Sequence, residues 1–226
     1  MKLSSETVSV LKNFSTINQN LVIKEGSSIS TMSAMKNIVS RAEVSETFPR
    51  QFAIYDLNEF LSALSLFSEP DLDFQDDFVV ITENGSSSKT LTYWYSDPSV
   101  VTTPTKEIEM PPCEVSFNFS DKMLSDTQKA ASVIGAPDMV LEGTGGEAVV
   151  KVTDKKNSTA NDYAVSMDVS NEEEVPYKFW FKVENLKLMS GTYDVKVSSK
   201  SISHFTNTKN DIQYWIALEP ESKYNA

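Results

Sequence analysis

The chain has 226 residues, 40% of them hydrophobic, and its apolar runs are far shorter than the roughly 18 residues of a membrane-spanning helix. No signal peptide is evident at its start, and the single cysteine, Cys113, excludes an internal disulfide and a metal site built from several cysteines. The net charge of -12 argues against a surface that is basic throughout, although the positions of the 20 basic residues decide whether one face binds nucleic acid. We therefore predict a cytoplasmic protein without a membrane partner.

Two helices are predicted in the first half of the chain. Over residues 4–17, Val10, Phe14 and Ile17 form an apolar stripe at helical spacing after a suitable N-cap, Ser4. A second helix begins after the cap residue Asp56. Short alternating runs predict antiparallel strands at 21–23, 28–33, 38–44, 51–55, 71–74, 77–82 and 89–95. Asn84-Gly85 predicts a hairpin between the last two.

Between Ser96 and Pro112 the chain carries four prolines and no periodic pattern. Proline lacks a backbone donor and fixes φ, so this stretch is expected to be an extended connector. We place the domain boundary here. The predicted domains are residues 1–108, which include most of the connector at about 96–112, and residues 109–226.

The second half repeats this order of elements. A helix is predicted over 120–134 with Ser120 as its cap, and a short helix over 183–189. Strands are expected at 113–118, 138–143, 147–153, 162–169, 176–182, 192–198, 200–206 and 211–218. The sequence Gly143-Thr144-Gly145-Gly146 is expected to be a hairpin turn, because it lacks the Lys-Ser/Thr pair and the helix of a phosphate-binding loop. Glu172-Glu173-Glu174 is expected to be a solvated turn.

Two pairs of segments indicate an internal repeat. Tyr93–Pro98 closes one hydrophobic segment and Tyr214–Pro220 closes another, 121 positions later. Phe52–Asn58 has a similar partner in Phe179–Asn185. A period of half the chain suggests two similar domains rather than a solenoid, whose repeats are about 20–50 residues long. Two like domains suit a symmetric assembly better than an active-site cleft.

No catalytic constellation is found. Cys113 and His204 are the only candidates for a Cys/His pair, and no supporting motif surrounds them. Adjacent carboxylates such as Asp76-Asp77 are too common in this chain to indicate acid–base chemistry or a metal. We therefore predict a non-enzymatic protein that needs no cofactor or metal.

The lysines on the predicted helices are a better candidate for function. Lys12, Lys122, Lys129 and Lys187 lie opposite the apolar stripes, so three of the four predicted helices present lysine outward. Simple solvation of helix faces explains this pattern, and so does a basic, helix-lined face on an acidic body. Glu59 on the second helix weakens the second explanation.

A set of short strings, in colinear order along the chain, carries a family resemblance. They are Met1-Lys2-Leu3-Ser4, Leu11-Lys12-Asn13-Phe14, Thr16-Ile17-Asn18, Ala53-Ile54-Tyr55-Asp56-Leu57-Asn58, Asp97-Pro98-Ser99, Pro104, and Ala217-Leu218-Glu219 followed by Ser222 and Asn225. Together they resemble the sliding clamp of T-even-type bacteriophages, the DNA polymerase processivity factor. The match is dense over residues 1–66 and sparse in the second half.

The resemblance implies an α+β DNA-clamp fold with two similar domains per chain. Antiparallel sheets would form the outside of a ring and helices would line its inside. Three chains would join head to tail as a homotrimer that encircles duplex DNA in the infected bacterium and tethers the replicative DNA polymerase. A clamp-loader ATPase would open the ring, and late-transcription factors would also bind it.

The resemblance also implies site residues. The helix lysines Lys12, Lys122, Lys129 and Lys187 would face the DNA phosphates. A partner-peptide pocket, which would take the polymerase C-terminal peptide, would be lined by Met32, Ile108, Met110, Trp215, Leu218 and Pro220, although ordinary core packing also explains Met32 and Trp215. Two alternatives remain at this point: an oligomeric phage tail or baseplate protein, and an enzyme with an unrecognised acidic metal site.

Overall fold

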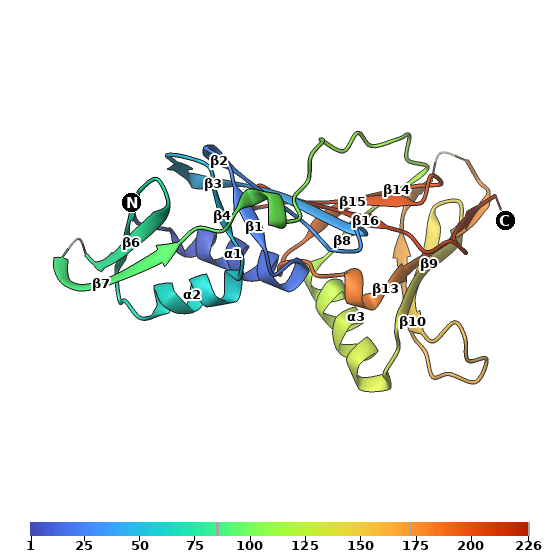
Figure 1. Cartoon of the computed structure of the whole chain (residues 1–226). Helices are drawn as coiled ribbons and strands as arrows, with labels where there is room; N and C mark the ends of the chain where they lie inside the picture. The colour runs from blue at the N-terminus through green and yellow to red at the C-terminus, as the bar shows by residue number, and fades with distance from the viewer. Residues whose placement is uncertain (85, 172, 226) are drawn as a thin grey trace. The chain divides into compact units, whose positions relative to one another are not determined.

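The computed structural model describes residues 1–84, 86–171 and 173–225. The chain divides into two compact units, Met1–Lys106 and Glu107–Ala226, and the division falls inside the proline-rich connector. Each unit combines antiparallel strands with helix (Figure 1). None of the described helices is long and apolar enough to cross a membrane.

The first unit contains the helices α1 (Ser5–Ile17) and α2 (Leu57–Ser65). Its strands are β1 (Leu21–Ile23), β2 (Gly26–Met32), β3 (Ile38–Phe48), β4 (Phe52–Ile54), β5 (Pro70–Phe74), β6 (Phe78–Glu83) and β7 (Ser86–Trp94). Strands β3, β2, β1 and β4 neighbour one another in that order, and β5, β6 and β7 form a second sheet. Helix α1 packs against α2 and against β2 and β3 (Figure 1).

Side-chain caps fix the starts of both helices in this unit. The Ser4 hydroxyl accepts the backbone N–H of Thr7 at 3.1 Å, and the Asp56 carboxylate accepts two N–H groups of the first turn of α2. Helix α1 buries Val10, Leu11, Phe14 and Ile17, the apolar stripe that the sequence predicts. After α2 and the second sheet, Pro98–Val100 forms a single 3₁₀ turn at the beginning of the connector.

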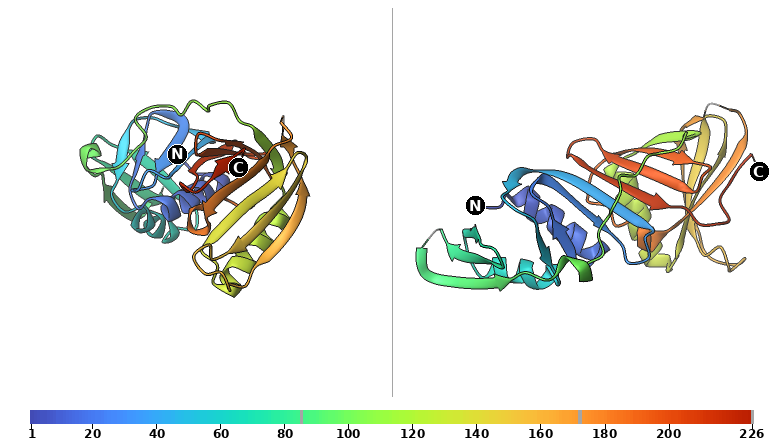
Figure 2. Two further views of the ribbon diagram at one scale, coloured as in Figure 1. Left: turned by 90° about the vertical axis from the view of Figure 1, so that its right-hand side faces the viewer. Right: turned by 45° about the horizontal axis from the view of Figure 1, so that its top comes forward.

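The second unit contains one α-helix in its described residues, α3 (Asp121–Ile134). Its strands are β8 (Val115–Phe119), β9 (Asp138–Thr144), β10 (Glu147–Thr153), β11 (Tyr163–Asp168), β12 (Ser170–Asn171), β13 (Pro176–Lys182), β14 (Tyr193–Ser198), β15 (Ile202–Asn207), β16 (Ile212–Ala217) and β17 (Lys223–Tyr224). One sheet has the order β11, β10, β9, β13, β17, and β12, β8, β14, β15 and β16 follow one another in a second. Helix α3 packs against β10 and β11 (Figure 2).

The predicted repeat is present in the order of the elements. Helix α1 is followed by strands with the sheet order β3, β2, β1, β4, and helix α3 is followed by strands with the order β11, β10, β9, β13. The hairpin strands β5, β6 and β7 correspond in the same way to β14, β15 and β16. The paired sequence segments also coincide, because Phe52 and Phe179 lie on the equivalent strands β4 and β13.

The predicted helix over 183–189 is wrong. Only a 3₁₀ turn, η2 (Val183–Asn185), is formed there. The following carbonyl groups pair outside the segment, since Gln128 donates to the carbonyl of Leu186 at 2.9 Å and the Tyr193 hydroxyl donates to that of Met189 at 2.7 Å. Asn185, Leu186 and Leu188 are all buried, although they do not share one face of a helix.

The predicted turns have mixed outcomes. The glycine-rich turn is confirmed as the connection between β9 and β10, whose strands pair antiparallel on either side of it. Strands β6 and β7 also pair antiparallel, but Gly85 of the predicted Asn84-Gly85 turn lies outside the described residues, as does Glu172 of the acidic turn. The two-residue strands β12 and β17 are not predicted, because two residues are too few to show alternation.

Candidate nucleic-acid interface

Lys12 lies on the solvent-exposed side of α1, between the buried residues Leu11 and Phe14. The other outward positions of this helix are mainly hydroxyl residues such as Ser5, Ser9 and Thr16. The placement predicted from the apolar stripe is therefore correct for Lys12, and its ammonium group can reach solvent or a ligand beside α1.

Lys122 and Lys129 lie on the exposed face of α3, opposite Leu124 and Ala131, which are buried. Between them stands Asp126, whose carboxylate forms an i,i+4 ion pair with the Lys122 ammonium. This hydrogen bond raises the pKa of Lys122, so the side chain stays charged at neutral pH. The Lys122 side chain is 84% exposed, which makes the pair weak and open to exchange for another anion.

Lys187 does not share this environment. It follows η2 in irregular backbone, and its side chain is half-buried and engaged in contacts of its own. Its predicted position on an exposed helix face is wrong, because no helix forms over 183–189. The set of helix-borne lysines is therefore reduced to Lys12, Lys122 and Lys129.

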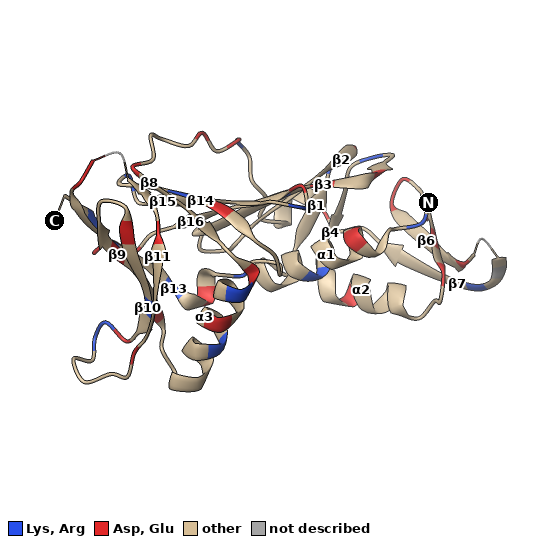
Figure 3. Ribbon diagram, turned by 180° about the vertical axis from the view of Figure 1, so that it is seen from behind, with Lys and Arg blue, Asp and Glu red and all other residues tan. Residues whose placement is uncertain are grey.

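The helices as a group are not basic. The three α-helices carry three lysines and four carboxylates, and both signs appear on them in Figure 3. The carboxylates are Glu6, Glu59, Asp121 and Asp126, of which Glu6, Glu59 and Asp121 are exposed. Exposed serines occupy much of the remaining surface, among them Ser62 on α2 and Ser125 on α3. A surface of this kind offers weak, scattered contacts to phosphates rather than a continuous basic patch.

The residues predicted for a partner-peptide pocket fall in three places. Ile108 and Met110 are half-buried in the connector. Trp215 lies on β16, and Leu218 and Pro220 follow directly after that strand, with Leu218 buried and Pro220 exposed. Met32 ends strand β2 in the first unit and is half-buried. Packing within the chain thus covers Leu218 but leaves part of the other five side chains accessible.

Trp215 stacks on the only histidine of the chain. The rings of His204 and Trp215 are 4.8 Å apart and nearly parallel, at 7°, on neighbouring strands β15 and β16. His204 Nε2 lies 2.8 Å from Oε1 of Gln213, while Lys196 of β14 faces it from the other side. Burial, followed by the charge of Lys196, lowers the pKa of His204.

This environment makes stability depend on pH in a predictable direction. Because the folded pKa of His204 lies below its ordinary value, the unfolded chain binds the proton more readily. We expect the whole contribution of His204 to the free energy of unfolding to be present at pH 7. This contribution should decrease as the pH drops below about 6.5, where the histidine of the unfolded chain becomes protonated. Urea unfolding at pH 7 and pH 5.5 should show a smaller decrease for His204→Gln than for the unchanged chain. An equal decrease would assign the pH dependence to the carboxylates.

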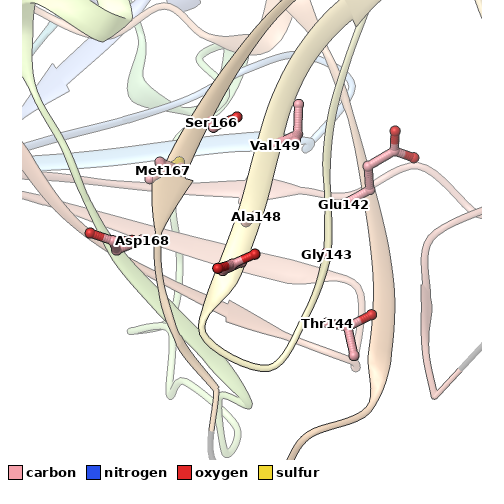
Figure 4. Close-up of a pocket in the computed structure, with 9 residues that line it drawn as sticks. Glu142, Gly143, Thr144, Ala148, Val149, Ser166, Met167 and Asp168 are labelled. Atoms are coloured by element: carbon pink, nitrogen blue, oxygen red, sulfur yellow. The ribbon is translucent and has the colours of Figure 1, made fainter.

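A cavity of about 570 Å³ lies beside the β9–β10 turn (Figure 4). It is lined by residues of β9, β10 and β11, including Glu147, Asp168 and Met167. Glu147 and Asp168 stand directly opposite each other in the ladder, and neither carboxylate forms an ion pair in the described part of the chain. None of the residues predicted for the partner pocket lines this cavity. No group of three metal-ligating side chains is found among the described residues.

Comparisons with known proteins decide the family. The family of DNA polymerase processivity factors matches residues 4–102. The sliding clamp of Vibrio phage KVP40 is 33% identical over 97% of this chain and 99% of its own length. The chain belongs to the sliding clamp family. The clamps of Escherichia phage RB69 and Enterobacteria phage T4 are 27% and 25% identical, each over the full length of both chains.

Solved structures agree with this fold. PCNA from Thermococcus kodakaraensis superposes with a TM-score of 0.71 at 15% identity, covering 95% of this clamp and 96% of that chain. Proliferating cellular nuclear antigen from Entamoeba histolytica gives 0.68 at 14% identity, covering 94% of each chain. The predicted family and the α+β clamp fold are therefore confirmed, and so is the non-enzymatic role as a processivity factor.

The sequence missed one feature of this clamp that bears on assembly. Strand β7 pairs with β6 alone and β11 pairs with β10 alone in the described residues of the two units, so each has an unpaired edge. Trp94 at the end of β7 is 65% exposed and contacts only one described aromatic ring, that of Phe78 at 4.9 Å. The predicted strands indicated hairpins but not their order in a sheet, so the free edges could not be derived from the sequence.

Proposed function

We propose that three copies of this clamp close into a ring around duplex DNA and tether the replicative DNA polymerase of the phage. The single observation that carries this function is the family membership, supported by the repeat of two similar units in one chain. A tail or baseplate protein would not explain either the match to processivity factors or the similarity to PCNA. We place the clamp in the cytoplasm of the infected bacterium, where the replication machinery works.

We propose that β7 of one copy pairs with β11 of the next. An unpaired strand edge offers a row of free N–H and C=O groups, and β7 in the first unit and β11 in the second each have such an edge. A contact between two unlike edges is heterologous and closes into a ring when the rotation permits it. The charges also suit each other, because Lys89 lies on β7, whereas Asp168 lies on β11 opposite Glu147. Trp94 would lose its exposure in this contact.

We propose that the outward faces of the helices meet the DNA backbone through Lys12, Lys122 and Lys129, with Lys187 as a weaker contributor. The near balance of lysines and carboxylates on these helices suits a clamp that is retained topologically and must slide. Each lysine adds salt-dependent, sequence-independent attraction without fixing the clamp at one position. The ion pair of Lys122 with Asp126 weakens the attraction further until a phosphate replaces the carboxylate.

We propose further that a C-terminal peptide of the polymerase docks where the connector and the end of β16 offer accessible apolar side chains. A clamp-loader ATPase would open the ring, and late-transcription factors would use the same docking site. Met110, Ile108 and Trp215 support this placement, since they remain half-exposed although they are large and apolar. The methionine can adapt to several partners.

The experiment that tests encirclement compares circular with linear DNA. The clamp is loaded onto a singly nicked circle with the cognate loader and ATP, and the circle is then cut once by a restriction enzyme. We expect the clamp to remain on the intact circle and to leave the linear form, because a ring can slide off an end. Equal retention on both forms would show direct DNA binding and would overturn the ring.

Met110→Asp tests the docking site. The carboxylate would enter a half-buried apolar position, and desolvating it on binding is unfavourable. We expect the affinity for the C-terminal peptide of the cognate polymerase to fall about tenfold or more in a calorimetric titration. Met35→Asp is the matched control, since Met35 is 83% exposed on the β2–β3 turn. Unchanged affinity for Met110→Asp would place the pocket elsewhere.

A further inference from the structure

The C-terminal segment of the chain lies along the outer edge of strand β13. Lys223 and Tyr224 form the short strand β17 and pair with Lys178 and Tyr177. Closer to β16, the backbone N–H of Glu219 donates to the carbonyl of Trp180 at 2.8 Å. The N–H of Trp180 donates to the Ser222 hydroxyl at 2.8 Å. The segment therefore supplies the β13 edge with the partners that another strand would otherwise supply.

This cover is incomplete. Strand β13 has seven residues, yet its ladder with β17 includes only two of them. The N–H of Trp180 is satisfied by a side chain instead of a backbone carbonyl. Pro220, Glu221, Lys223 and Asn225 are exposed. A segment with so little buried surface belongs to the least stable part of a fold and opens more easily than the sheet it covers.

Charge, rather than apolar packing, holds the first part of the segment. The Lys155 ammonium lies 3.1 Å from the Glu219 carboxylate and 2.9 Å from that of Glu221, and its side chain is only 10% exposed. Lys182 pairs with Asp138 at 2.6 Å and lies 3.9 Å from Glu219. Asp138 is 1% exposed and also accepts the backbone N–H of Lys155 at 3.1 Å. The five charged groups form one network between the sheet and the segment.

Removing the segment would leave this network unbalanced. Lys155 and Lys182 would remain beside a single carboxylate, Asp138, and a poorly solvated ammonium without enough counter-charge is costly. The ring of Trp180 lies beneath the same region, 5.8 Å from the Lys155 ammonium and 5.1 Å from that of Lys178. A free strand edge, a surplus of positive charge and an aromatic surface together favour an extended acidic segment.

We propose that the β13 edge, with Lys155 and Lys182, is a docking site for an extended acidic segment of a partner protein. The chain's own segment 219–225 occupies this site as an intramolecular competitor. Its sequence, Glu-Pro-Glu-Ser-Lys-Tyr-Asn, shows the chemistry that the site accepts: two carboxylates about two residues apart, followed by residues that pair as a strand. The site lies within a single unit of one chain, so it exists whether or not the ring forms.

The test uses a fluorescein-labelled peptide with the sequence of residues 218–225 and the full chain. In the variant Glu219→Lys/Glu221→Lys, like charges should release the segment from Lys155 and Lys182. We expect the peptide to bind this variant and to bind the unchanged chain at least about tenfold more weakly in fluorescence anisotropy, because a tethered competitor acts at about millimolar effective concentration. A peptide in which both glutamates are glutamine should bind much more weakly to the variant.

A matched pair of lysine variants identifies the charge that matters. Adding Lys155→Gln to the released variant should lose about tenfold or more in peptide affinity, whereas adding Lys156→Gln, on the adjacent exposed lysine, should change little. Equal binding to the released and unchanged chains, or equal effects of the two lysine variants, would overturn the site.

In the unchanged chain, amide hydrogen exchange at Trp180 and Glu219 should become faster at high salt, relative to exchange at the amides of β9 and β10. Salt-independent exchange would show that the ion pairs of Lys155 and Lys182 do not hold segment 219–225, and this result does not depend on the folding of any variant.

Discussion

Replacing Lys122 and Lys129 with glutamate should cut processive DNA synthesis about tenfold or more while leaving the oligomer intact. Both side chains are exposed on α3, so the substitutions should cost little folding stability. In a homotrimer the inner charge would fall by about twelve units, which replaces phosphate attraction by repulsion along the path of the DNA. Primer extension on a long single-stranded circle, with loader and polymerase present, measures the product length.

The control for charge alone is the double variant Lys24→Glu/Lys209→Glu, since Lys24 and Lys209 are exposed and lie outside the helices. That pair of substitutions changes the net charge equally but should leave the product length unchanged. The salt dependence gives a second readout, because the unchanged clamp should lose retention on DNA more steeply with salt than the double variant does. Full processivity of Lys122→Glu/Lys129→Glu would show that the outward face of α3 does not meet DNA.

Trp94→Ser should convert the ring to monomers at concentrations where the unchanged clamp is a trimer. Trp94 is 65% exposed beside the free edge of β7, and a large aromatic residue buried in an interface typically contributes about 2 kcal/mol or more. The loss is repeated at each of the three proposed contacts, so polymerase stimulation should disappear with the ring. Native mass spectrometry across a dilution series measures the fraction of trimer.

Tyr55→Ser is the matched control for this prediction. Tyr55 is 60% exposed but lies between β4 and α2, outside strands β7 and β11. Its replacement should leave the trimer unchanged. A stable trimer for Trp94→Ser, or a monomer for both variants, would contradict the proposed pairing of β7 with β11. A monomeric unchanged clamp at all concentrations would contradict the ring itself.

The proposed ring contact and the proposed docking site use opposite edges of the same sheet. Strand β11 forms one edge of the β11–β10–β9–β13 sheet and lies on the proposed contact between copies, whereas β13 lies next to the opposite edge, under β17. A partner that displaced the C-terminal segment would therefore bind without competing for the ring contact. If Trp94→Ser fails to dissociate the ring, the docking edge on β13 can still be tested in the ring, and failure of the docking test leaves the Trp94→Ser prediction in force.

Most elements of the fold could be predicted from the sequence because their signals are local. The apolar stripe and the Ser4 cap determine α1, and the equivalent stripe with Ser120 determines α3 within one residue at its start. The helix predicted over 183–189 failed because the carbonyl groups of Leu186 and Met189 accept hydrogen bonds from side chains of α3 and β14. Competition between local and tertiary hydrogen bonds is not visible in the sequence of one segment.

By itself, the sequence determined α1, α2 and α3, most of the strands, the repeat in the order of elements and the family resemblance, since each depends on the spacing of residues along the chain. It also placed Lys12, Lys122 and Lys129 on outward helix faces, because the period of a helix sets which side chains oppose the buried stripe. Only the tertiary structure decided that β7 and β11 have free edges and that Lys155 holds the C-terminal segment. These two features depend on strand order and on pairs of charges up to 66 positions apart, which are fixed when the sheets assemble.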